Sequence, residues 1–124
     1  MKRNLQTILT LVAIQAALGF MTVLHAQQDP VVGGYQEASV TDRDVMTAAR
    51  YAVRKEKQRR GGASVKLVSI ERAEKQVVAG MNYRLCLRVK IKGKIRRITT
   101  VVYKNPDQMH ALTSWKPGAC QVGT

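Results

Sequence analysis

The sequence contains few of the side chains that catalysis and metal binding most often use. Its 124 residues include two histidines, two cysteines and eight acidic residues, against 21 lysines and arginines. A zinc site needs three or four ligands close together, and acid–base catalysis needs paired, positioned groups. The few candidates are spread along the chain, so the sequence argues against an enzyme and predicts neither a metal site nor a cofactor.

Two patterns resemble catalytic or ligand-binding motifs, but the residues around them argue against both functions. Cys86 and His110 would be a nucleophile and its base, but Cys86 lies in the middle of an expected strand, on its polar face. The glycine pairs at 33–34 and 61–62 are not followed by the Lys-Ser or Lys-Thr of a phosphate-binding loop. Function is therefore expected in the loops of a binding module.

Aromatic residues are equally scarce, since the chain has one Trp, four Tyr and one Phe. Proteins that bind single-stranded nucleic acids stack the bases on aromatic side chains, and no such platform is visible. The net charge of +13 attracts polyanions in general but predicts no specific nucleic-acid partner. A solvated helix face is the simplest interpretation of the densest basic run, which comprises Arg54, Lys55, Lys57, Arg59 and Arg60.

The N-terminus has the order of a secretory signal peptide. A basic head at residues 2–3 precedes an uncharged stretch from Ile8 to Leu24, and the small residue Ala26 precedes a polar run. A transmembrane helix is the competing interpretation, because the stretch is near the lower length limit for one. The basic head and the small residue favour cleavage after Ala26. We therefore expect a signal peptide at 1–26 and a secreted protein, periplasmic or extracellular, with no transmembrane segment after cleavage.

The remaining residues, 27–124, are enough for one domain with one hydrophobic core. A helix is predicted over residues 42–60, with Thr41 as the N-cap and Asp44 three residues further on. The apolar side chains that recur with the period of one helix face are Val45, Ala48, Ala49, Ala52 and Val53.

After the helix the apolar period changes to two, which is typical of half-buried strands. A phase slip at Leu67–Val68 predicts a bulge. A helix with one apolar face must lie on a sheet, so the fold class is α+β, one helix packed across a four- to five-stranded antiparallel sheet. Residues 27–34 are expected to form a flexible arm and 121–124 a loose tail. The expected strands cover residues 35–38, 65–70, 83–91, 95–103 and 109–115.

The cysteines, Cys86 and Cys120, both lie in the expected mature chain. A small exported domain gains stability from a disulfide, so a Cys86–Cys120 bridge is the first expectation. Two free, buried thiols are the alternative.

One expected hairpin tip, Gln76 to Gly80, carries small and apolar residues where turns are usually polar. Exposed Val77 and Val78 would cost solvation free energy and would indicate a binding surface. The alternative is an ordinary hairpin whose valines tuck under the sheet.

Four segments resemble the cystatin family of cysteine protease inhibitors, and the plant-type cystatins most closely. Gln76 to Gly80 is similar to the QVVAG loop of cystatins, and the Asn-Tyr pair that often follows that loop is present. Gly33-Gly34 resembles the N-terminal glycine pair of the family, residues 49–53 its helix motif ARFAV, and residues 112–116 its final-strand motif LTSFK. Their order and spacing also fit, and the likeness covers about residues 31–121.

The resemblance implies a wedge that enters the cleft of a papain-like cysteine peptidase and blocks it reversibly without being cut. The arm, the first hairpin loop and a second loop at 105–107 would form this wedge. The residues that the resemblance assigns to protease binding are Gly33, Gly34, Gln76, Val77, Val78, Ala79, Gly80, Pro106 and Asp107.

The sequence departs from the family pattern in two places. The family usually has Pro-Trp in the second loop, whereas Pro106 is followed here by Asp107, and losing a buried Trp costs roughly 2–4 kcal/mol of binding free energy. Cys120 resembles the last cysteine of animal secreted cystatins, but the usual partner, near Ile98 here, is absent. A bridge to Cys86 would need the tail to fold back across the outer face of the sheet.

The sequence also allows a second function. The chain would then be a cystatin-fold module with no protease target, binding an anionic surface or polyanion through a net charge that is +11 without Lys2 and Arg3. We expect a monomer, with a dimer that is domain-swapped through the first hairpin loop as the alternative.

Overall fold

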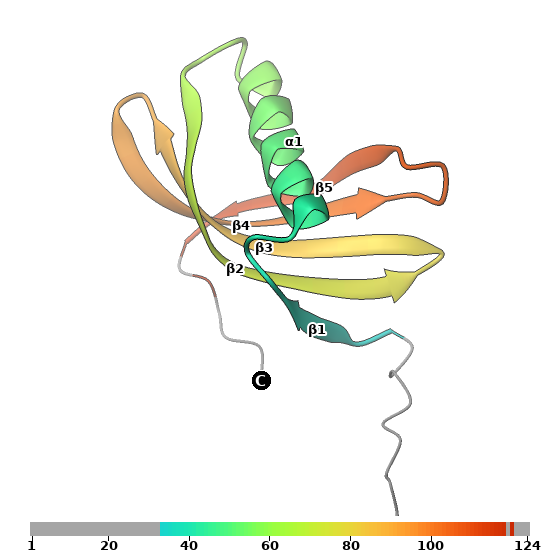
Figure 1. Ribbon diagram of the computed structural model, residues 1–124. Coiled ribbons are helices and arrows are strands. Elements are labelled where there is room, and N and C mark those ends of the chain that lie inside the picture. The colour runs from blue at the N-terminus through green and yellow to red at the C-terminus, as the bar shows by residue number, and fades with distance from the viewer. Residues whose placement is uncertain (1–32, 119, 121–124) are drawn as a thin grey trace, which may run out of the picture.

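The computed structural model describes residues 33–118 and Cys120, and it places one helix on a five-stranded antiparallel sheet (Figure 1). The strands lie in the sheet in their order along the chain, so each contacts its sequence neighbours. This arrangement confirms the expected α+β class. The elements are β1 (Tyr35–Ala38), α1 (Arg43–Arg59), β2 (Val65–Val78), β3 (Gly80–Ile91), β4 (Lys94–Lys104) and β5 (His110–Pro117).

Several expectations fall outside the described residues: the signal peptide at 1–26, most of the arm at 27–32, and the tail at 121–124. In the part of the chain that is described, no helix is long and apolar enough to cross a membrane.

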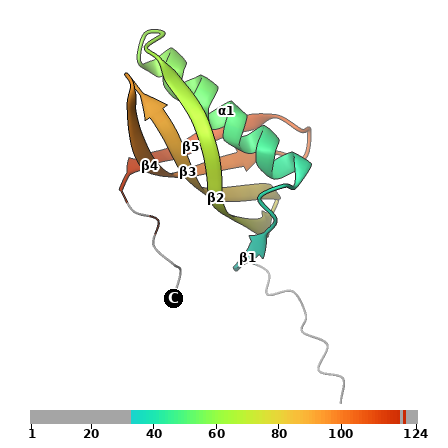
Figure 2. The ribbon, with the colours of Figure 1, turned by 60° about the vertical axis from the view of Figure 1, so that its left-hand side comes forward.

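The helix α1 lies across one face of the sheet and buries the apolar face that its sequence predicts (Figures 1 and 2). Its N-cap is Asp42, whose carboxylate accepts hydrogen bonds from the backbone N–H groups of Asp44 and Val45, so the prediction of Thr41 was wrong. The Thr41 hydroxyl instead lies 2.8 Å from the hydroxyl of Ser39 and is occupied in the preceding turn.

The end of α1 contains a buried carboxylate that the sequence pattern did not single out. Glu56 is fully buried and forms ion pairs with Arg59 at 2.7 Å and Arg60 at 2.8 Å. The hydrogen bond from Arg59 is the main cause that lowers the pKa of Glu56, against the opposite effect of burial. Two members of the basic run are therefore tied to a carboxylate rather than simply solvated.

The strand β2 is longer than predicted, because it continues through Arg72 and Glu74 as far as Val78. Its pairing with β3 shifts register between Leu67 and Ser69, as the phase slip predicts, and again between Ile70 and Arg72. Such bulges bend and twist a strand. The sheet accordingly curls around the helix in both views (Figures 1 and 2).

The core lies between α1 and the inner face of the sheet. Four alternate side chains of β3 are buried there, as the period of two predicts, and they meet inner residues of β4 and the helix. Trp115 of β5 packs against this cluster, as expected for the final strand. The β3 side chains are Tyr83, Leu85, Leu87 and Val89.

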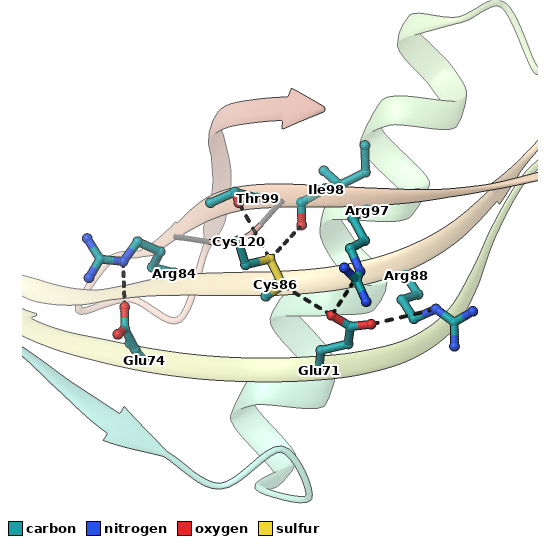
Figure 3. The surroundings of a disulfide bond; sticks show 9 residues. All are labelled: Glu71, Glu74, Arg84, Cys86, Arg88, Arg97, Ile98, Thr99 and Cys120. Atoms are coloured by element: carbon teal, nitrogen blue, oxygen red, sulfur yellow. Dashed lines mark hydrogen bonds and ion pairs between the residues drawn. A yellow bond between two sulfur atoms is a disulfide. The ribbon is translucent and has the colours of Figure 1, made fainter. Parts of the chain in front are cut away.

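A disulfide joins Cys86 of β3 to Cys120, which confirms the expected bridge over two free thiols. The Cα atoms are 5.6 Å apart, within the range that a disulfide spans. After β5 the chain returns across the outer face of β4, so that the Cys120 sulfur lies 3.6 Å from the Thr99 hydroxyl oxygen (Figure 3). The bridge thus reaches one strand beyond the position near Ile98 that the family pattern would use.

Replacing both cysteines by alanine is expected to lower the free energy of unfolding by roughly 2–4 kcal/mol, because the cross-link spans 34 residues and restricts the unfolded chain. Urea unfolding followed by circular dichroism measures the change. Reducing the parent protein should lower its stability to that of the variant. A double variant as stable as the oxidised parent would contradict the prediction.

Candidate functional site

Three segments that lie far apart in the sequence meet at one end of the sheet. The turn between β2 and β3 is there, and the register places Tyr35 opposite Gln76, so the start of β1 lies beside it. Lys104, at the end of β4, pairs with both Met81 and His110, so the loop between β4 and β5 lies at the same end. Figure 1 shows the three segments along one side of the molecule.

The first loop is a tight hairpin tip with exposed apolar side chains. Ala79 alone separates β2 from β3, since Val78 already pairs with Gly80. Val77 is 58% exposed and Val78 is 38% exposed, so neither valine tucks under the sheet. Successive strand residues project to opposite faces. The two valines therefore present an apolar surface on both sides of the tip.

Contacts from β4 hold the tip in place. The hydroxyl of Tyr103 donates a hydrogen bond to the carbonyl oxygen of Ala79. Gly80 has a φ of 110°, and a Cβ at this position would collide with the carbonyl oxygen of Lys104 and lie 3.0 Å from the Tyr103 ring. Only glycine fits both the backbone conformation and the space. Sequence reasoning missed Tyr103, whose role depends on a neighbour 24 residues away.

The side chain of Gln76 ties the arm to the same hairpin. Its amide nitrogen donates to the carbonyl oxygen of Gly33, and its amide oxygen accepts from the side chain of Asn82 at 2.9 Å. Gly33 has a φ of 101°, which suits the left-handed turn that leads into β1. Gln76 is therefore a structural link between the arm and the first loop, while Gly33 itself stays exposed.

The second loop runs from Asn105 to Met109 and is closed by its own hydrogen bonds. The Asn105 backbone N–H donates to the Met109 carbonyl oxygen at 2.8 Å, and the Asn105 side chain accepts from the Met109 N–H at 2.9 Å. Pro106 and Asp107 are exposed at the tip, where the resemblance places them. Met109 is 66% exposed and provides an apolar side chain on a loop that lacks the expected Trp.

The helix anchors this second loop. The Tyr51 hydroxyl donates to the His110 carbonyl oxygen at 2.7 Å, and the two rings pack with centroids 5.3 Å apart. Burial and then the charge of Lys104 lower the pKa of His110 below its ordinary value, so the imidazole is neutral near pH 7. Over the described residues, no three His, Cys, Asp or Glu side chains come together as a metal site.

Known proteins that resemble this chain agree on its architecture. Residues 38–118 match the model of a family described as "Aspartic acid proteinase inhibitor". The "Putative cysteine proteinase inhibitor 7" of Oryza sativa subsp. japonica is 30% identical over 105 residues, which cover 82% of this chain and 90% of the rice protein.

Three solved structures share the fold at lower identity. The salivary cystatin of the soft tick Ornithodoros moubata superposes with a TM-score of 0.61 at 20% identity, over 70% of this chain and 98% of its own. Mialostatin, a gut cystatin of the hard tick Ixodes ricinus, has a TM-score of 0.60 at 18% identity, over 71% of this chain and 100% of its own. Dimeric human cystatin F has a TM-score of 0.59 at 19% identity, over 81% of this chain and 96% of its own.

One helix laid across a five-stranded antiparallel sheet, with two hairpin loops and the start of β1 at one end, defines a protein of the cystatin-like fold. The chain belongs to the cystatin family of proteinase inhibitors and is not an enzyme.

Replacing Gly80 by alanine is expected to destabilise the protein by roughly 2–4 kcal/mol, because strain from the positive φ adds to a steric clash. Gly93→Ala is the matched control, since Gly93 also has a positive φ, 81°, but open space around its Cα. The control should cost only about 1 kcal/mol. Urea unfolding measures both changes. If the two variants lose the same free energy of unfolding, the contact with Tyr103 and Lys104 does not constrain the tip.

Proposed function

We propose that the protein is a reversible, tight-binding inhibitor of papain-like cysteine peptidases. The observation that carries the proposal is the exposure of Val77, Val78 and Met109 at the same end of the sheet as the Gly33-Gly34 arm. We call this end the inhibitory edge. The printed name of the rice relative, a cysteine proteinase inhibitor, supports the same class of target.

The chemistry of the inhibitory edge suits a narrow, apolar cleft. Val77, Val78 and Ala79 form the central plug, because their side chains are small and already exposed. The glycines of the arm allow the backbone to lie close against a cleft wall. Tyr103 and Gln76 hold the first loop and the arm before binding, so little conformational entropy is lost on docking.

The second loop contributes a different contact from that of the family pattern. Pro106 and Asp107 occupy its tip, and Asp107 would lose solvation against an apolar rim. Met109 lies at the end of the same loop, and a flexible thioether side chain adapts to irregular apolar surfaces. We propose that Met109 replaces part of the contact area of the missing Trp.

We further propose that the protein is secreted and acts as a monomer. The Cys86–Cys120 disulfide is typical of an oxidising compartment, which agrees with the expected signal peptide at 1–26. The inhibitory edge is complete within one chain, so no second copy is needed to form it.

A second candidate function is inhibition of an aspartic proteinase. The matched family description names that class of target, and the match begins at residue 38, after the Gly33-Gly34 arm. The same exposed loops would then bind a different cleft. The unusual Pro106-Asp107 tip is compatible with a changed target.

Replacing Val77 and Val78 by aspartate is expected to weaken papain inhibition roughly 100-fold or more, because two carboxylates would lose solvation in an apolar cleft. The matched control makes the same change to aspartate at Val40, which is 37% exposed, and at Val68, which is 48% exposed. Both of these valines lie away from the inhibitory edge. Both variants should keep the circular dichroism spectrum of the parent. If the Val77/Val78 variant inhibits papain as well as the parent does, the plug assignment is wrong.

Titration of the protein against papain and against pepsin distinguishes the two candidate targets. We expect inhibition of papain and none of pepsin, because the small-residue plug and the glycine arm both match the pattern of cysteine peptidase inhibitors. Inhibition of pepsin alone, lost in the Val77/Val78 variant, would favour the aspartic proteinase while keeping the inhibitory edge.

A further inference from the structure

Basic residues gather at the end of the molecule opposite the inhibitory edge. The turn at Lys92-Gly93 joins β3 to β4 there, and the end of α1 lies near it. No acidic residue occurs in the sequence between Glu74 and Asp107. We call Arg60, Lys92, Lys94 and Arg96 the basic end.

A hollow of about 350 Å³ lies between the end of α1 and the β3–β4 hairpin, lined by all four residues of the basic end. Arg96 pairs across the sheet with Val89, which is fully buried under the helix side, so both side chains belong to that face. Lys94 pairs with Ile91 on the same face. The cations therefore converge on one hollow rather than diverging into solvent.

Among the described residues, Lys92, Lys94 and Arg96 have no carboxylate within ion-pair distance. Like charges held close together cost folding free energy. A hollow in which three of four cations have no counter-charge is suited to an anion from outside the chain.

On the outer face of the sheet, two glutamates each lie between two arginines. Glu71 lies between Arg88 and Arg97, 3.6 Å and 3.5 Å from them (Figure 3). Glu74 similarly pairs with Arg72 at 3.1 Å and with Arg84. In the basic end only Arg60 has such a partner, Glu56, whereas no carboxylate lies within ion-pair distance of the three hairpin cations Lys92, Lys94 and Arg96.

We propose that the basic end binds the sulfate or carboxylate groups of an acidic polysaccharide. The disulfide is typical of an oxidising compartment, which agrees with the secreted location proposed above, and acidic polysaccharides are polyanions that a secreted protein can meet there. No aromatic side chain lines the hollow, so it offers no surface for stacking bases. Strand β3 separates the basic end from the inhibitory edge by roughly 35 Å, so glycan and peptidase bind at the same time.

The test replaces Lys92, Lys94 and Arg96 by glutamine and measures binding by isothermal titration calorimetry. A heparin octasaccharide serves as the sulfated probe and an oligogalacturonate as the carboxylated probe. The control variant removes the same charge from the exposed side of the helix, through Arg43→Gln, Arg50→Gln and Lys57→Gln.

The hairpin variant should bind the preferred probe at least roughly tenfold more weakly, and its salt dependence should fall by about one unit of slope per cation removed. The affinity of the helix variant for the same probe should fall by less than about threefold. Papain inhibition should be equal in both variants and the parent, which separates this test from that of the proposed function.

Three results would overturn the proposal. Equal losses in the two variants would mean that binding reflects the overall net charge. No binding of either probe at about 0.1 M salt, where exposed charges are already screened beyond about 10 Å, would exclude a glycan site. The parent protein could also bind phosphatidylserine vesicles more tightly than either probe, and the hairpin variant could lose this binding. That result would assign the basic end to a membrane surface instead.

Discussion

The packing of an alanine-lined helix face into a curved sheet is the contact on which the rest of the structure depends. Ala48, Ala49 and Ala52 are fully buried, and their small side chains let the helix axis approach the sheet closely. The two bulges in β2 bend the sheet around that helix. A larger side chain at any of these alanines would push the layers apart and flatten the sheet.

The order of the strands then separates the ends of the molecule. Because each strand pairs with its sequence neighbour, alternate turns fall at opposite ends: β2–β3 and β4–β5 at one, β3–β4 at the other. The inhibitory edge and the basic end follow from this alternation. The first presents exposed apolar side chains and is held by Tyr103 and Gln76, whereas the second is hollow and cationic. Short-range steric fit and long-range charge attraction thus act on different surfaces.

The outer face of the sheet has a third role, which is to stabilise the chain without taking part in binding. The Cys86–Cys120 disulfide ties the end of the chain to the central strand, and Glu71 and Glu74 lie beside it among four arginines. A small domain with an alanine-rich core has limited apolar area to bury, so a cross-link on its outer face adds stability where the core cannot. Both ends of the sheet remain free.

Local periodicity and turn chemistry determined most of the architecture. The helix limits, the existence of five strands and the first bulge follow from patterns that neighbouring residues set by themselves, whereas the continuation of β2 to Val78 does not. The tip valines could also be located from the sequence, because they break the usual polarity of turns, and so could the second loop, because Asn105-Pro106-Asp107 interrupts a run of strand-forming residues. The spacing of Thr41 and Asp44 predicts Thr41 as the N-cap, but the adjacent Asp42 is equally suitable locally, and the contact of Thr41 with Ser39 decides between them.

Only the tertiary structure decided which segments meet. The contacts of Tyr103 with Ala79 and of Gln76 with Gly33 join residues 24 and 43 positions apart, and no local pattern encodes such pairs. The exposure of Met109 and the missing counter-charges at Lys92 and Arg96 depend likewise on what the fold brings near them. The sequence by itself determined the elements, through the conformational preferences of short stretches. The fold determined the two surfaces, because burial and charge balance are set by neighbours in space.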